Sequence, residues 1–163
     1  MQIPATGVSI CCLRKHAPID IHWYVAASTD LELMPKFRSL FVGLPLVDGD
    51  QDRFVGEFRA RLILASEGGL RKPDQVDGPT RKPTNIDLFE MRWCFYYGND
   101  ELIHVRMYHV EPPRLGSLVV ALHLHVKDVT PGIDVEHAQD EEIKIAADRY
   151  WDGKSDTWGR FDD

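Results

Sequence analysis

Hydrophobic and polar residues alternate along three consecutive stretches of the C-terminal half, 88–96, 102–110 and 117–127. Because successive side chains of a β-strand point to opposite faces, a period of two predicts three strands. The connections between them, at Gly98–Asp100 and at 111–116, are short, so neighbouring strands are expected to be antiparallel. The pattern therefore predicts a three-stranded antiparallel meander.

Other stretches repeat apolar residues at helical spacing. A helix beginning near Asp50 or Asp52 and ending at Gly68-Gly69 is predicted by the shared face of Phe54, Phe58, Leu62 and Ala65. A shorter helix is predicted from Met34 to Phe41, with Pro35 in its first turn, and a final helix near 143–151. Residues 19–25 are rich in β-branched and aromatic side chains and predict a further strand, and 8–13 is a weaker strand candidate. The stretch 70–85, with three prolines and several basic residues, predicts a long exposed loop.

Each strand of the meander carries an apolar side and a polar side. Covering the apolar side with helices gives an α+β fold, with an antiparallel sheet of about four strands and the helices on one face, in two layers. We expect a single domain over 1–163, with an acidic tail at 153–163. The polar side is expected to face solvent and is unusually rich in cationic and imidazole groups: Glu90, Arg92, His104, Arg106, Tyr108, His123, His125 and Lys127.

Composition narrows the function classes. The net charge is −7, and residues 134–163 hold ten acidic against four basic residues, so the acidity belongs to the tail and nonspecific coating of nucleic acid is disfavoured. No apolar run approaches the roughly 20 residues that span a bilayer, and the N-terminus lacks a secretory pattern. Adjacent Cys11 and Cys12 rarely form a relaxed disulfide, and a reduced cytoplasmic location is expected.

The order of the strand motifs resembles the RelE/ParE toxin superfamily, and within it HigB-like and phage-derived proteins. The resemblance covers about 19–152 and is strongest after Leu88. The segments that carry it are Leu88-Phe89-Glu90-Met91-Arg92, His104-Val105-Arg106-Met107-Tyr108, Val119 to Lys127, Thr130-Pro131 and Ile143 to Arg149.

This resemblance implies the toxin of a type II toxin–antitoxin pair, an endoribonuclease that cleaves mRNA, usually on the ribosome, and that is held in check by a cognate antitoxin. The chemistry would be metal-free attack of the ribose 2′-OH on the adjacent phosphate, with no cofactor and no membrane partner. The catalytic set would be Arg92, Arg106, His123, His125 and Lys127, with guanidinium groups holding phosphate and imidazoles moving protons. The RNA-binding set would be Lys72, Arg81, Lys82, Tyr108 and His109.

Two alternatives stay open. The acidic balance and a length well above about 100 residues depart from the superfamily, and they favour a catalytically silent protein-binding module of the same fold. The His123-x-His125 pair, with His104 or Glu90 as further ligands, also suits a small metal-binding enzyme. Arg92 and Arg106 have a simpler interpretation as cross-strand ion-pair partners of Glu90.

Overall fold

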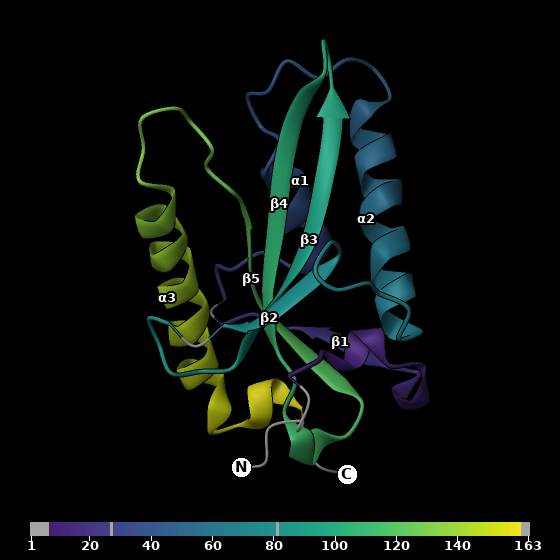
Figure 1. Cartoon of the computed structure of the whole chain (residues 1–163), viewed down its shortest axis with the longest axis vertical. Helices are drawn as coiled ribbons and strands as arrows, with labels where there is room; N and C mark the ends of the chain where they lie inside the picture. Colours follow the sequence, from purple (N-terminus) through teal and green to yellow (C-terminus); the bar gives the residue numbers. More distant parts are fainter. Residues whose placement is uncertain (1–6, 27, 81, 161–163) are drawn as a thin grey trace.

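A mixed five-stranded sheet with helices on both sides forms the molecule (Figure 1). The computed structural model describes residues 7–26, 28–80 and 82–160. In chain order the elements are the short 3-10 helices η1 (Ile10–Cys12) and η2 (Arg14–His16), β1 (Asp20–Trp23), α1 (Leu33–Ser39), α2 (Asp50–Ser66), β2 (Val76–Thr80), β3 (Leu88–Tyr97), β4 (Glu101–Val110), η3 (Pro113–Leu115), β5 (Leu118–Val126), α3 (Val135–Lys154) and η4 (Thr157–Gly159). None of these helices is long and apolar enough to cross a bilayer.

The sheet order is β1-β5-β4-β3-β2. The meander β3-β4-β5 is antiparallel, as predicted, and its first turn uses Gly98 and Asp100, both with positive φ. β1 pairs in parallel with β5. The strand after the two helices, β2, runs opposite to β1, and β3 and β5 then run in the same direction as β1. The α+β class is confirmed, whereas the expectation of about four strands, all antiparallel, is wrong in the strand count and in the direction of β1.

The fifth strand lies in the stretch that was expected to be an exposed loop. Within 70–85, residues Val76–Thr80 form β2, which pairs with β3 at the edge of the sheet. Pro79 is compatible with this position, because an edge strand has one side free of ladder hydrogen bonds. At the N-terminus the weak strand candidate 8–13 is also corrected, since Ile10–Cys12 is a 3-10 helical turn.

Helices cover both faces of the sheet, so the molecule has three layers rather than two. On one face, α1 and α2 place Phe37, Phe54 and Phe58 against Trp93 and Phe95 of β3. On the other face, α3 packs Ile143, Ala146 and Tyr150 against apolar residues of β5 (Leu118, Val120, Leu122). Figure 1 shows α2 and α3 on opposite sides of the sheet.

A β-bulge in β5 explains the second apolar face. Tyr108 pairs with His123 and His109 pairs with Ala121, so Leu122 is an extra residue between the two pairs. Because of this extra residue, the alternation of side chains between the two sheet faces is reversed on either side of the bulge. Leu118, Val120 and Leu122 therefore lie on the same face as His123 and His125, which a uniform alternation would have placed opposite them.

The tail is anchored rather than loose up to residue 160. α3 (Val135–Lys154) is capped at its N-terminus by Asp134, whose side chain accepts a hydrogen bond from the His137 amide at 3.1 Å. Beyond it, Trp158 is buried against Tyr150, with ring centroids 5.3 Å apart.

Candidate functional site

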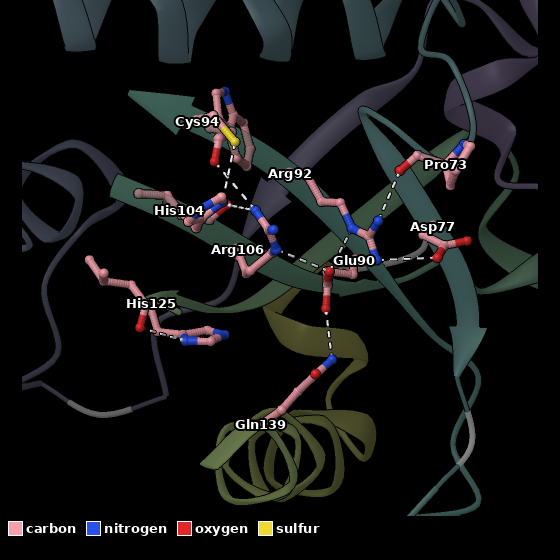
Figure 2. A network of polar contacts seen from close by, with 12 residues as sticks. Pro73, Asp77, Glu90, Arg92, Cys94, His104, Arg106, His125 and Gln139 are labelled. Carbon is pink, nitrogen blue, oxygen red and sulfur yellow. Dashed lines mark hydrogen bonds and ion pairs between the residues drawn. The ribbon is translucent and has the colours of Figure 1, made fainter. Parts of the chain in front are cut away.

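Several of the polar residues singled out in the sequence lie on the sheet face that α3 covers, among them Glu90, Arg106 and His125 (Figure 2). The strand register places Arg92 opposite Arg106, and Arg106 opposite His125, in one row across three strands. In the next row, Glu90 pairs with Tyr108 and Tyr108 with His123. The prediction that these side chains share one face is thus consistent with the structure.

Glu90 is the centre of an ion-pair network. Its Oε1 lies 2.7 Å from Nε of Arg92 and 3.2 Å from Nε of Arg106. Its Oε2 accepts a hydrogen bond from the side-chain amide of Gln139 on α3, at 3.2 Å. Arg92 also forms a 3.2 Å ion pair with Asp77 of β2. Both arginines therefore have carboxylate partners within the chain.

Arg106 is held by the backbone as well as by Glu90. Its Nη1 donates to the carbonyl oxygens of Trp93 (3.3 Å) and Val105 (3.0 Å), and only 8% of the residue is exposed. Burial lowers the pKa of this guanidinium and Glu90 opposes the effect. Arg92 is half-buried, with 30% of its side chain exposed, so it is the more accessible cation of the pair.

The two histidines of β5 face α3 with stacked rings. Their centroids are 5.3 Å apart and the planes are 8° from parallel. His123 donates a hydrogen bond from Nε2 to the Glu142 carboxylate on α3, and this bond lowers the pKa of Glu142. Nδ1 of His125 lies 4.0 Å from the same carboxylate.

His125 differs from His123 in its hydrogen bonding. Its Nδ1 donates to the carbonyl oxygen of Val126 at 3.2 Å, whereas its buried Nε2 has no hydrogen-bond partner. Burial lowers the pKa of His125 to about 4, with Glu142 acting in the opposite direction. At neutral pH the ring is uncharged, and Nε2 carries a free lone pair that can accept a proton.

A cavity of about 30 Å³ lies between this network and the first half of α3. Its lining residues come from the sheet and from α3: Glu90, Arg106, Tyr108 and His125, and Ala138, Gln139 and Glu142. Such a volume holds about one water molecule and excludes a nucleotide. The expectation of a polar face open to solvent is therefore wrong, because the apolar half of that face binds α3, and the helix then also covers the histidines and Arg106.

Lys127 and Tyr108 differ in accessibility. Lys127 lies at the rim of the cavity and is half-buried. Tyr108 is fully buried and stacks on His125 at 5.4 Å between centroids, so it offers no exposed ring to a nucleic-acid base. Burial, together with the nearby Glu90 carboxylate, raises its pKa.

Among the described residues that were predicted to bind RNA, His109, Lys72 and Lys82 do not join this site. His109 is fully buried and stacks on Phe89, in the core on the α2 side of the sheet. The Lys72 ammonium donates to the carbonyl oxygen of Gly78 at 3.0 Å. Lys82 is exposed, and Arg81 lies outside the described residues.

Sequence reasoning missed the residues that close the site. Gln139 and Glu142 project toward the sheet from one face of α3, and Asp77 comes from the unpredicted strand β2. The spacing of three between Gln139 and Glu142, in line with apolar Ile143 and Ala146, is the signal that could have identified a polar, sheet-facing end of this helix.

Within the described ranges, one set of three His, Cys, Asp or Glu ligand atoms is close enough to hold a metal ion, namely Cys11, His109 and Glu111. His123 and His125 are not part of it. His104, suggested as a further ligand, instead lies with its Nδ1 3.3 Å from the sulfur of Cys94.

Comparison of the chain with protein-family models, with curated proteins and with solved structures found no match. The resemblance to the RelE/ParE superfamily therefore depends on the order of the strand motifs alone.

Proposed function

We propose that this chain is the toxin of a toxin–antitoxin pair, an endoribonuclease that cleaves mRNA at the sheet face beneath α3. One observation carries the proposal: Arg92, Arg106 and His125 form a single row across three adjacent strands. Two guanidinium groups beside a neutral imidazole supply the groups that phosphodiester cleavage requires, namely cations for phosphate oxygens and a proton acceptor.

The residues would divide the chemistry as follows. Nε2 of His125 takes the proton from the ribose 2′-OH, and the 2′-oxygen attacks the neighbouring phosphorus. Arg92 and Arg106 stabilise the charge that develops on the phosphoryl oxygens. The 5′-oxygen leaves with a proton donated by His123, and the products are a 2′,3′-cyclic phosphate and a free 5′-hydroxyl end.

Substrate entry would require the first half of α3 to move away from the sheet. The polar contacts that hold it are the hydrogen bonds from His123 to Glu142 and from Gln139 to Glu90. A phosphate that enters would replace the carboxylate of Glu90 as the partner of the two arginines. The structure thus corresponds to the closed state of the proposed enzyme.

The test is cleavage of a defined mRNA by the purified chain, with and without ribosomes, alongside growth arrest on expression. His125→Gln should slow cleavage about 100-fold or more, as expected for loss of a general base. Arg92→Ala, at the half-exposed arginine, should slow it as well, while His137→Gln, at an exposed position on α3, should cleave normally. Circular dichroism verifies that each variant is folded. If the wild-type chain leaves RNA intact both with and without ribosomes, the proposed ribonuclease activity is refuted.

A second function, a catalytically silent module that binds a protein partner, is favoured by a separate observation. Arg92 and Arg106 already have Glu90 as a partner, Asp77 pairs with Arg92, and the whole chain is acidic. Such a site attracts RNA weakly. This function predicts a stoichiometric complex with a protein encoded beside this one, and no RNA cleavage in any condition. A chain that stays monomeric when the neighbouring protein is co-expressed argues against it.

A further inference from the structure

A second buried polar cluster lies where the N-terminal segment meets the end of β4. The sulfur of Cys11, a ring nitrogen of His109 and a carboxylate oxygen of Glu111 all lie within 4.8 Å of one another. Cys11 and His109 are completely buried, and Glu111 is 9% exposed. Cys11 belongs to the core on the α2 side of the sheet, so this cluster is separate from the site beneath α3.

Hydrogen bonds between the N-terminal segment and the end of β4 fix these groups in place. Oε2 of Glu111 accepts from the Ile10 amide at 2.9 Å, and Oε1 accepts from the Ser9 hydroxyl and from Nε2 of His109, the latter at 3.0 Å. The Cys11 amide in turn donates to the Ser9 hydroxyl oxygen at 3.1 Å. The turn η1 and the end of β4 therefore hold three potential metal ligands close together.

The cluster is incompletely satisfied by the protein. Within the described part of the chain, the ion-pair partner of the Glu111 carboxylate is His109, and neither lysine nor arginine contacts it. Nδ1 of His109 is buried without a hydrogen-bond partner. Burial and the neighbouring Glu111 raise the pKa of the Cys11 thiol. The Glu111 carboxylate accepts three hydrogen bonds, whereas a buried ring nitrogen without a partner is costly.

We propose that Cys11, His109 and Glu111 bind a divalent transition-metal ion of the zinc class, with a water molecule as the fourth ligand. Sulfur, imidazole nitrogen and carboxylate oxygen are the ligand types that zinc accepts, whereas magnesium and calcium prefer oxygen alone. A dication balances the charge of one thiolate and one carboxylate. The bound ion would fasten the N-terminal segment to β4, and this role does not depend on ribonuclease activity.

The test uses the full chain, refolded from denaturant with cobalt(II) so that burial of the site does not prevent entry. One equivalent of cobalt should bind, give a thiolate-to-cobalt charge-transfer absorption, and be displaced by zinc. Cys11→Ser should abolish the absorption and weaken binding at least about tenfold. Cys94→Ser removes an exposed thiol and is the matched control, which should bind as the wild type does.

X-ray absorption of the zinc-loaded wild type tests the site without any variant. The proposal predicts one sulfur at about 2.3 Å, with nitrogen and oxygen ligands near 2.0–2.2 Å. Substoichiometric metal, or a shell without sulfur, overturns it. A cobalt absorption that survives Cys11→Ser and disappears in Cys94→Ser overturns it as well, because the metal would then sit on the surface thiol.

Discussion

Lowering the pH from 7 to 5 is expected to destabilise the fold by about 2 kcal/mol through one side chain, His125. The perturbation acts on a buried ring whose pKa is lowered to about 4 from an ordinary value of 6.5. Between pH 6.5 and pH 4 the unfolded chain binds a proton at this position and the folded chain does not. The contribution of His125 to the unfolding free energy is therefore fully present above pH 6.5 and is lost as the pH falls toward 4.

The magnitude follows from this difference in pKa. Each unit of pKa difference corresponds to 1.36 kcal/mol, so complete titration costs about 3 kcal/mol, of which about 2 kcal/mol is lost between pH 7 and pH 5. The lowered pKa of Glu142 also makes acid destabilising, because its stabilisation is present above the unfolded pKa of about 4.5 and disappears below it. That window lies mostly below pH 5, so the two contributions can be separated.

Urea unfolding at pH 7 and pH 5 measures the effect, and His125→Gln isolates it from the other titrating groups. The variant should lose about 2 kcal/mol less than the wild type over this interval. His137→Gln changes an exposed histidine and should keep the wild-type pH dependence. If His125→Gln and the wild type lose the same free energy between pH 7 and pH 5, the ring is not held neutral by burial and the reasoning is wrong.

Other substitutions test the packing. Gly153→Ala should destabilise the chain although alanine favours helices, because the added Cβ would overlap the Trp158 indole and lie 2.8 Å from a ring carbon of Tyr24. Gly56→Ala meets nothing within 4 Å and should raise the unfolding free energy, measured in urea, by about 1 kcal/mol. Phe58→Ala should cost about 3–5 kcal/mol in the same assay, whereas Ile63→Ala, at a 59% exposed position, should cost far less; equal costs would contradict the assigned core. Glu90→Gln should lower the unfolding free energy by about 3 kcal/mol, since it leaves two arginine charges without their shared carboxylate; an unchanged denaturation midpoint would contradict this.

The sequence alone determined the elements whose signals are local. Periodicity, turn residues and short connections predict strands over 88–96 and 102–110, a helix ended by Gly68-Gly69 and an antiparallel meander. The structure has β3 at Leu88–Tyr97, β4 at Glu101–Val110 and α2 ending at Ser66, with the meander antiparallel. The alternation of side chains along β3 and β4 also placed Arg92 and Arg106 on one face, because the pairing of these two strands is regular.

Only the tertiary structure shows which sheet face each residue of β5 occupies and which side chains of α3 pack over the polar residues of the sheet. Residues 118–122 are all apolar, so the sequence shows no break in alternation where Leu122 is inserted. With both faces of the strand buried, a one-residue shift leaves the hydrophobic pattern unchanged, and only packing against α3 shows which side each residue occupies. For the same reason, the sequence brought His123 and His125 beside the arginines but did not show that Glu142 and Gln139 would close the site above them.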